Sequence, residues 1–334
     1  MIDSPRQCHE GVPPRGIWQL EKKMSWIRKN TLSFLQSLAV KIIKCGRIPQ
    51  HVAFIMDGNR RYARKNKVAG IQGHAEGFNK LAETLQWCLD LGIKEVTVYA
   101  FSIENFKRNQ KEVDALIDLA RKKFQRLLDE SDRLTENGVR ISVIGNMSLI
   151  PEHLRQLMAK AMLITKDNDK AFLNIAFAYT SRDEITETVK TIAEGVKNND
   201  IDTADVTEKL FSKCLYTSRS SDPDLIIRTS GEIRFSDYLL WQISHSYVHF
   251  SNVLWPESSI WDLLIAIFHY QRSYADLERM RLYQKAIDQP CSFRATTFAN
   301  KIENNRRKLL EQLAVAIAHI PPKSKINPSF VNIK

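Results

Sequence analysis

Three short stretches of the sequence combine arginines with small polar residues, and each directly follows an apolar run that suits a buried strand. Their chemistry-bearing residues are Asp57, Gly58, Asn59, Arg60 and Arg61 in the first, Ser102, Asn105 and Arg108 in the second, and Arg228, Arg234 and Ser236 in the third. Arginines with few matching acids suit a pyrophosphate, because the planar guanidinium donates two parallel hydrogen bonds to phosphate oxygens. The three stretches therefore predict a site for phosphate-bearing ligands.

Asp57 is the acid in these stretches that suits a metal ion. Mg²⁺ takes one or two protein carboxylates and fills its remaining positions with phosphate and water oxygens. Gly58 lets its backbone N–H approach an oxygen closely. Taken singly, each residue has an ordinary alternative: Asp57 as a helix cap, Arg60 and Arg61 as a solvated basic face, His74 as a structural histidine. The coincidence of three clusters favours a magnesium-assisted phosphate site.

The clusters offer room for two anionic groups. One set is residues 57–61 with His74 and Arg108, and the other is Arg228, Arg234 and Ser236. The chain contains no G-x-x-x-x-G-K-[ST], so a P-loop nucleotide site is excluded. It also lacks the D-D-x-x-D pattern with which all-helical chain-elongating enzymes hold several Mg²⁺ ions.

The elements that must position these residues alternate between strand and helix. The patterns predict strands at 51–57, 95–101, 139–145, 172–179, 224–229 and 247–250, and helices near 74–91, 111–136, 151–166 and 182–198. Near-continuous apolar strands separated by helices indicate an α/β fold with a mostly parallel sheet covered on both faces. Ligands of such sheets bind outside the carboxyl ends of the strands, so we expect the three clusters to meet on one rim.

The charge distribution argues against a nucleic-acid partner. The chain of 334 residues has a net charge of +11, but residues 1–50 and residues 273–334 each carry +6, which leaves −1 for the body. A nucleic-acid enzyme more often carries its positive face on the fold itself. Five scattered cysteines without a C-x-x-C favour reduced thiols over a disulfide framework or a zinc site. No apolar run approaches the roughly 18–20 residues that span a bilayer.

The two ends differ from the body. We expect residues 1–23 to be a disordered leader without signal-peptide features and residues 24–48 to hold an amphipathic helix. That helix either packs on the body, or it lies in a membrane interface or gates the entrance of an apolar ligand. Residues 49–272 are predicted to form a single catalytic domain. Residues 273–334 are predicted to be a helical and flexible tail, with one more helix near 309–318.

Five motifs together resemble the cis-prenyltransferases, the family of undecaprenyl and dehydrodolichyl diphosphate synthases. They are "HVAFIMDGNRRYA", "GHAEGFNKL", "YAFSIENFKR", "IRTSGEIRFSDYLLWQ" and "VLWP". The match covers about residues 50–272, and the wording is most similar to that of the family's animal catalytic subunits. The resemblance implies a six-stranded, mostly parallel sheet flanked by helices. It also implies that farnesyl diphosphate is condensed with successive isopentenyl diphosphates to a long polyprenyl diphosphate, the precursor of the dolichol glycosyl carrier.

The resemblance also implies roles for the residues of the three clusters. Asp57 would hold Mg²⁺; Gly58, Asn59, Arg60, Arg61 and Arg108 would bind the pyrophosphate of the primer, with His74 beside it; Arg228, Arg234 and Ser236 would bind isopentenyl diphosphate; Ser102 and Asn105 would lie near the reacting carbons. The growing chain needs an apolar tunnel. Leu81, Leu85, Leu116, Leu119 and Phe124 suit its wall, although they suit an ordinary core equally well.

Three departures from the family pattern bear on partners. Gly70 stands where many relatives carry an arginine for the pyrophosphate, and Tyr247 stands where bacterial homodimers carry a metal-binding glutamate. The late R-x-G motif, which completes a neighbouring active site across a dimer, is missing. The absent motif therefore implies a heteromer with a non-catalytic homologous subunit of the Nogo-B receptor type. The amphipathic helix, the basic ends and the need of a long apolar product for a bilayer predict peripheral attachment to the cytosolic face of the endoplasmic reticulum. Gly70 leaves an accessory, weakly active subunit of the same fold as the alternative.

Overall fold

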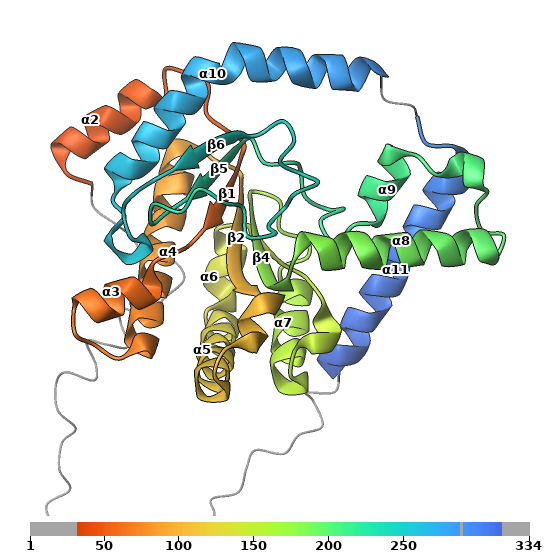
Figure 1. Cartoon of the computed structure of the whole chain (residues 1–334), viewed down its shortest axis with the longest axis horizontal. Coiled ribbons are helices and arrows are strands. Elements are labelled where there is room, and N and C mark those ends of the chain that lie inside the picture. Colours follow the sequence, from red (N-terminus) through yellow and green to blue (C-terminus); the bar gives the residue numbers. More distant parts are fainter. Residues whose placement is uncertain (1–31, 288–289, 316–334) are drawn as a thin grey trace, which may run out of the picture.

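The apolar runs of the sequence form strands, and the strands form one parallel sheet. In the computed structural model, which describes residues 32–287 and 290–315, the sheet has six strands in the order β3-β4-β2-β1-β5-β6 (Figure 1). Every neighbouring pair is parallel. The strands are β1 His51–Ile55, β2 Glu95–Ser102, β3 Val139–Ile144, β4 Ala171–Tyr179, β5 Leu225–Arg228 and β6 Tyr247–Phe250. The predicted α/β class and strand count are confirmed.

Helices connect the strands and cover the sheet. They are α2 Phe34–Ile43, α3 Asn59–Lys65, α4 Gly70–Leu91, α5 Gln110–Asp129, α6 Ser131–Glu136, α7 Glu152–Ile164, α8 Ser181–Lys197, α9 Glu208–Cys214, α10 Ile260–Ile287 and α11 Phe293–Val315, with short 3₁₀ turns η1 Ile103–Lys107, η2 Met147–Leu149, η3 Thr203–Asp205 and η4 Trp255–Glu257. The helix predicted over 111–136 is broken at Glu130, where φ is −103° and ψ is 18°. The pattern hides this break because Leu127 and Leu134, seven residues apart, are buried on either side of it.

Side chains of β1 alternate between two cores. Val52 and Phe54 face the larger core, which α4, α5, α7 and α10 cover, whereas Ala53 and Ile55 face a smaller core on the other side. The smaller core is completed by the segment between β5 and β6, through Tyr238 and other side chains. Both faces of the sheet are therefore covered, as near-continuous apolar strands require.

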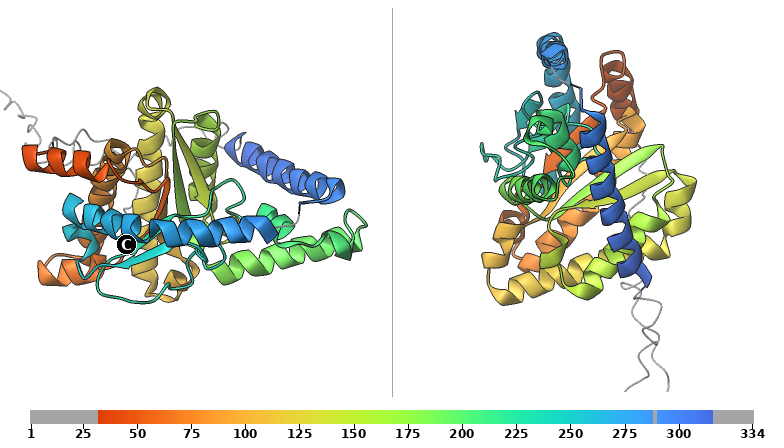
Figure 2. Two further views of the ribbon diagram at one scale, coloured as in Figure 1. Left: turned by 90° about the horizontal axis from the view of Figure 1, so that it is seen from above. Right: turned by 90° about the vertical axis from the view of Figure 1, so that its right-hand side faces the viewer.

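The last two helices change the predicted domain boundary. α10 runs without a break from Ile260 to Ile287, so the boundary predicted at residue 272 falls inside a helix. α11 begins at Phe293, well before the helix predicted near 309–318, and packs against α7 and α9 (Figure 2). Gly195 also lets α11 approach α8 closely, because a Cβ there would lie 2.5 Å from Cζ of Phe298. The tail is thus part of the packed structure as far as Val315.

The amphipathic helix predicted over 24–48 is described from residue 32 onward, and the predicted leader 1–23 lies outside the described residues. α2 begins after a capping box made by Ser33 and Gln36. Ala39 and Ile43 pack against the larger core, while the opposite face is exposed and apolar. That exposed face consists of Phe34, Leu35, Leu38 and Ile42. None of the described helices is long and apolar enough to cross a bilayer.

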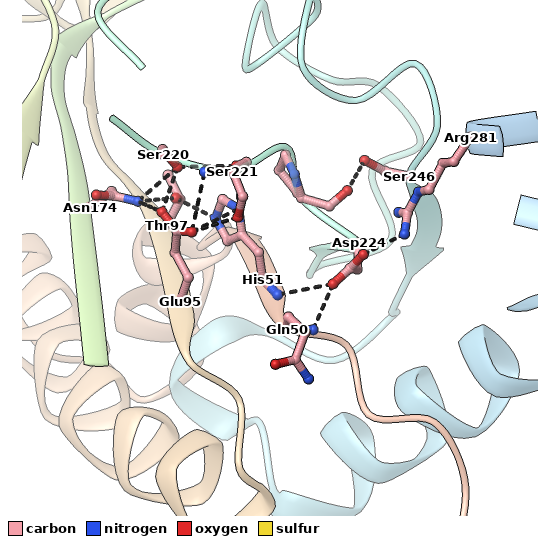
Figure 3. Close-up of polar contacts among 11 residues, drawn as sticks. Gln50, His51, Glu95, Thr97, Asn174, Ser220, Ser221, Asp224, Ser246 and Arg281 are labelled. Atoms are coloured by element: carbon pink, nitrogen blue, oxygen red, sulfur yellow. Dashed lines mark hydrogen bonds and ion pairs between the residues drawn. The ribbon is translucent and has the colours of Figure 1, made fainter. Parts of the chain in front are cut away.

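A buried carboxylate stabilises the sheet at the amino ends of its central strands. Glu95 Oε1 accepts hydrogen bonds from Ser220 Oγ at 2.6 Å and Asn174 Nδ2 at 2.8 Å, and Ser221 Oγ donates to Oε2 at 2.6 Å (Figure 3). Burial alone would raise the pKa of Glu95, but the nearby His51 and these hydrogen bonds lower it. The contacts fix the segment before β5 to the starts of β2 and β4.

Asp224 continues these contacts on the other side of β1. Its carboxylate accepts hydrogen bonds from the backbone N–H groups of Gln50 and His51, at 2.6 and 3.1 Å, and from Arg281 of α10 at 2.6 Å (Figure 3). The start of β1, the start of β5 and the far half of α10 are therefore held together at this end of the sheet. These contacts do not involve the carboxyl ends of the strands, where the sequence predicts the ligand site.

Candidate active site

The first and third sequence clusters meet because β5 lies beside β1. In the register of this pair Ile55 is opposite Arg228, and the chain turns directly after each of them. Arg228 Nη2 donates a hydrogen bond to Asp57 Oδ2 at 2.9 Å, and Thr229 Oγ1 donates to the backbone carbonyl of Asp57 at 2.9 Å. β1 ends two residues before Asp57, whose own N–H bonds back to the carbonyl of Ile55 at 3.0 Å. Asp57 thus lies in a turn at the rim.

The carboxylate of Asp57 is accessible from solvent although it is surrounded by donors. Its side chain is 32% exposed, and Oδ1 accepts a hydrogen bond from Gly58 N at 2.7 Å and lies 3.6 Å from Arg61 Nη2. The described residues contain no group of three or more His, Cys, Asp or Glu side chains that could bind a metal by itself. A single accessible carboxylate fits an ion such as Mg²⁺, which takes most of its oxygens from phosphates and water.

Gly58 is required by geometry at this turn. Its φ is +105°, which disfavours residues with a side chain, and a Cβ there would lie 2.7 Å from Ser230 Oγ and 3.0 Å from Leu254 Cδ2. Ser230 itself has φ +85°. The turns after β1 and β5 therefore touch each other, and their close approach depends on the glycine.

Two glycines of α4 bring that helix against Asn59. A Cβ at Gly73 would lie 2.3 Å from the carbonyl oxygen of Asn59, and one at Gly77 would lie 2.2 Å from its Oδ1. The indole of Trp255 donates a hydrogen bond to the carbonyl of Gly77 at 2.7 Å. Sequence reasoning gave no role to Trp255, although the "VLWP" motif that contains it was a signal. This tight packing positions His74, which lies on α4 between the two glycines.

Arg60, Arg64 and His74 lie in the wall of an open pocket of about 610 Å³, which we call the polar pocket after its charged residues. Gly70, Lys111 and Glu112 also line it, together with apolar side chains such as Val68, Ile71 and Leu116. Arg108 donates to Glu112 Oε1 at 3.0 Å, and burial and the charge of Arg60 lower the pKa of Arg108. Two guanidiniums that repel each other beside an open pocket favour an anionic ligand between them. Arg60, His74 and Arg108 are thus brought together as the first set predicts.

Protonation of His74 should weaken folding in mild acid. Burial first, and then the charge of Arg108, lower the pKa of His74 from 6.5 to about 4. Between these pH values the unfolded chain binds the proton and the folded chain does not. Stability is therefore complete above pH 6.5 and decreases as the pH falls toward 4. We expect this histidine to cost about 2 kcal/mol of unfolding free energy between pH 7 and pH 5.

Urea unfolding at the two pH values measures this effect. His74→Gln should remove most of the difference attributed to the buried imidazole, whereas His153→Gln, which replaces an exposed histidine of α7, should leave it unchanged. An identical acid response of His74→Gln and the wild type would contradict the assignment.

Arg228 also organises the loop of the third cluster. It is only 3% exposed, and its Nη1 donates to Ser236 Oγ at 2.7 Å and to the backbone carbonyl of Arg234. The Arg234 side chain pairs with Glu232 and points toward solvent, so it is available to a ligand at the loop surface. The loop is conformationally unusual, since Ser236 has φ +52°, and Asp237 and Leu239 also have positive φ.

Tyr99 supports the same loop, and sequence reasoning missed it. Its hydroxyl donates to the carbonyl of Ser236 at 3.3 Å and to that of Tyr179 at 3.1 Å, and its ring stacks on Tyr238 at 4.4 Å between centroids. The tyrosine lies in the middle of an apolar strand, where the sequence pattern gives no sign of a polar role.

Ser102 and Asn105 lie at the end of β2, on the same rim as the other two clusters. Asn105 Oδ1 accepts a hydrogen bond from Ser102 N at 3.0 Å, and Ser102 Oγ accepts one from the N–H of Glu104 at 3.2 Å. The two residues therefore form the capping box of η1. Their predicted place near the reacting carbons stays a prediction.

An apolar cavity of about 120 Å³ adjoins Asn59 and His74 between the sheet, α4 and α5. Its wall consists of Met56, Asn59, His74, Gly77, Phe78, Leu81, Val98, Ala100, Phe101, Leu116, Leu119, Ala120, Lys123, Phe124, Ile175, Phe177 and Trp255. Four of the five predicted tunnel residues line it. The fifth, Leu85, lines a smaller cavity of about 50 Å³ further along α4.

Comparisons with known proteins agree with this geometry. Residues 55–277 match the Prenyltransf family, described as undecaprenyl diphosphate synthase. A human dehydrodolichyl diphosphate synthase complex subunit is 55% identical over 77% of this chain and 78% of its own length. A subunit of the same description from Schizosaccharomyces pombe is 41% identical over 72% of this chain and 92% of its own. Lavandulyl diphosphate synthase from Lavandula x intermedia, solved with dimethylallyl diphosphate, superposes with a TM-score of 0.64 at 32% identity, covering 67% of this chain and 95% of that one.

Proposed function

Because the chain belongs to the undecaprenyl diphosphate synthase family and is a prenyltransferase, we propose that it extends farnesyl diphosphate with successive isopentenyl diphosphates in the cis configuration. The product is a long polyprenyl diphosphate of the dehydrodolichyl type, which precedes the dolichol carrier used in protein glycosylation. One observation carries the proposal: an apolar cavity opens beside a cationic pocket and the Asp57–Arg228 pair.

The site residues form two groups, one for the diphosphate of the primer and one for isopentenyl diphosphate. Arg60 and Arg108 neutralise the pyrophosphate of the primer in the polar pocket, and Gly58 brings its backbone N–H close to it. Asp57 would hold Mg²⁺, which when bound supplies positive charge to the departing diphosphate. The carboxylate and the guanidiniums are already in place before ligands arrive, and such preorganised charge is the usual source of electrostatic catalysis.

Isopentenyl diphosphate binds at the loop that Arg228 organises. Arg234 faces solvent there, and the contact of Ser236 with Arg228 fixes the position of its hydroxyl. Orientation of two substrates at adjacent sites converts a bimolecular reaction into an effectively unimolecular one. Tyr99 and Tyr238 act as positioning residues, because the hydrogen bond from Tyr99 to Ser236 and the stacking of the two rings hold the loop in place.

The alternative of a non-catalytic accessory subunit is not favoured. Asp57, Gly58, Asn59 and both arginines that follow are present and converge on one rim. Gly70 lies in the wall of the polar pocket, and a Cβ there would meet nothing within 4 Å. Compared with relatives that carry an arginine at this position, the pocket therefore has one cation fewer, but it stays open.

A product assay tests the proposed function. The chain, with a partner subunit, is incubated with farnesyl diphosphate, labelled isopentenyl diphosphate and Mg²⁺, and the extracted lipid is sized by chromatography. We expect a ladder of long polyprenyl diphosphates that disappears when EDTA removes the metal. Absence of labelled lipid under all metal conditions would overturn the proposal.

The proposed partner is a homologous subunit that carries the missing R-x-G motif. Two of the relatives are themselves described as subunits of a complex. α10 exposes Trp261, Ile265 and Phe268 at spacings of four and three residues, beside the edge strand β6 with its exposed Phe250. Such an apolar stripe at a sheet edge suits the interface of a stable complex.

We propose peripheral attachment to the cytosolic face of the endoplasmic reticulum through α2. Its exposed face is apolar, with Phe34 82% exposed, while Lys41 and Lys44 lie in and just after its last turn. A basic amphipathic helix of this kind lies in the interface of anionic membranes. The product also needs access to lipid, because its chain is long and apolar.

Vesicle sedimentation tests this attachment. Leu35→Glu with Leu38→Glu should reduce binding to vesicles containing phosphatidylserine about tenfold or more, because both side chains leave the apolar phase. Val189→Glu with Val206→Glu, which changes exposed valines outside α2, is the matched control. Equal binding by the two double variants would exclude α2 as the anchor.

A further inference from the structure

The loop that carries Ser236 has a backbone conformation that needs support. Ser236 and Asp237 follow one another with φ of +52° and +61°, and Leu239 has φ +49°. Residues with a side chain disfavour this left-handed region, although aspartate and asparagine adopt it more readily than most. Two consecutive residues of this kind persist only where the surrounding structure fixes them. The contacts of the turn therefore decide where the Ser236 hydroxyl lies.

Asp237 ties this turn to the first turn of α8. Its backbone carbonyl accepts a hydrogen bond from Ser181 N at 2.8 Å, and its Oδ1 accepts one from Arg182 N at 3.2 Å. These N–H groups have no acceptor inside their own helix, because they lie at its amino end. The negative charge of the carboxylate is also favourable there, next to the positive end of the helix dipole.

Contacts on both sides of Asp237 make the attachment specific. Before it, Arg228 Nη1 donates to Ser236 Oγ at 2.7 Å, and after it Leu240 N donates to Ser181 Oγ at 2.8 Å. The guanidinium of Arg182 lies 3.7 Å from Asp237 Oδ2 but is 85% exposed, so this ion pair contributes little. The hydrogen bond from Arg182 N is therefore the contact through which the Asp237 side chain acts.

We propose that Asp237 is a positioning residue for isopentenyl diphosphate, which holds the hydroxyl of Ser236 in place by tying its loop to the amino end of α8. The inference rests on the proposed function, because it assigns this loop to isopentenyl diphosphate. Asp237 acts through Ser236 and takes no part in the transfer step.

Loss of the carboxylate should affect one substrate and not the other. Without this contact the loop populates conformations in which Ser236 Oγ is displaced, and the apparent affinity falls in proportion to the competent fraction. Saturating isopentenyl diphosphate selects the competent conformation, so kcat should change little. The proposed primer site at Arg60 and Arg108 lies on other elements, and its affinity should stay the same.

Initial rates of the full chain with its partner subunit, measured with labelled isopentenyl diphosphate, test the inference. Asp237→Gly accommodates the positive φ but lacks the carboxylate. We expect it to raise KM for isopentenyl diphosphate about tenfold and to keep kcat within about twofold. Asp237→Asn retains an oxygen for Arg182 N and should stay within about twofold of the wild-type KM. Calorimetry with farnesyl diphosphate alone should give the wild-type dissociation constant for both variants.

Two other changes on α8 supply matched controls. Thr180→Ala removes the side-chain cap of the same helix, because Thr180 Oγ1 accepts from Asp183 N at 3.4 Å, but it removes no hydrogen bond to the loop. Asn199→Gly introduces a glycine at another positive φ, +58°, just beyond the far end of α8. Both controls should keep the wild-type KM for isopentenyl diphosphate.

A KM in Asp237→Gly within twofold of the wild type, or an equal rise in Thr180→Ala, overturns the role of Asp237. If Asp237→Gly does not fold, hydrogen exchange of the wild-type protein decides: isopentenyl diphosphate without primer should slow exchange of the Ser181 and Arg182 amides, and unchanged exchange at saturation overturns the role as well. Failure of the proposed function is distinct, since the wild-type complex would then form no labelled lipid.

Discussion

Replacing Asp57 with asparagine should lower kcat about 10³-fold while the protein stays folded. The substitution removes the negative charge that would hold Mg²⁺ and retains one oxygen, which can accept a hydrogen bond from Arg228 or from Gly58 N but not keep both contacts. Asparagine is preferred to alanine because Arg228 is buried, and an alanine would leave its Nη2 without any acceptor at this position. Removing one member of a buried ion pair costs about 3–5 kcal/mol, which would confuse loss of folding with loss of catalysis.

The matched control for Asp57→Asn is Asp224→Asn. Asp224 also pairs with an arginine, Arg281, but at the amino end of the sheet and away from the proposed ligands. We expect this control to lose about 1–3 kcal/mol of stability and to keep kcat within about twofold, because the ion pair and hydrogen bonds that it weakens lie away from the proposed ligands. Single-turnover assays and thermal unfolding of both variants separate the two effects. More than a tenth of the wild-type kcat in Asp57→Asn would contradict a role for this carboxylate in the reaction.

The second large effect concerns the partner. The purified chain alone should have about 10²-fold less activity than the same chain with an R-x-G-bearing subunit, because a missing cationic group at the reacting diphosphate costs about that much. The described residues 32–287 and 290–315 contain no R-x-G, and α10, which follows the last strand, leaves its apolar stripe uncovered.

Initial rates with and without the partner, at equal concentrations of this chain, measure the effect. A partner whose R-x-G arginine is replaced by alanine should bind this chain equally well and restore little activity, which separates assembly from catalysis. Full activity of the isolated chain would refute the obligate heteromer.

The sequence predicts the fold well because the information lies in local patterns. Each strand is an apolar run, and the rule that parallel strands present their carboxyl ends at one rim is enough to bring Asp57, Arg60, Arg108 and Arg228 together. The residues at which helices and strands begin and end are less predictable. α10 is the clearest case, since its apolar stripe of Trp261, Ile265 and Phe268 ends well before the helix does at Ile287.

Sequence patterns could not predict the contacts that depend on tertiary packing. Nothing in the spacing shows that Arg228 is buried and directed at Asp57, or that Tyr99 supports the loop after β5. The burial of Lys123 could not be predicted either, because a lysine on an amphipathic helix normally belongs to the solvated face. Only the packing of α5 beside Phe78 turns it inward.

The buried guanidinium of Arg228 has a consequence for the order of events at the rim. One of its nitrogens holds the carboxylate proposed to serve the primer, and another holds the serine hydroxyl proposed to serve the extender unit. A ligand that draws Asp57 away should alter the free energy of the second contact, so we expect the binding of the two substrates to be thermodynamically linked. By reciprocity, the factor by which either substrate changes the affinity for the other must be the same in both directions.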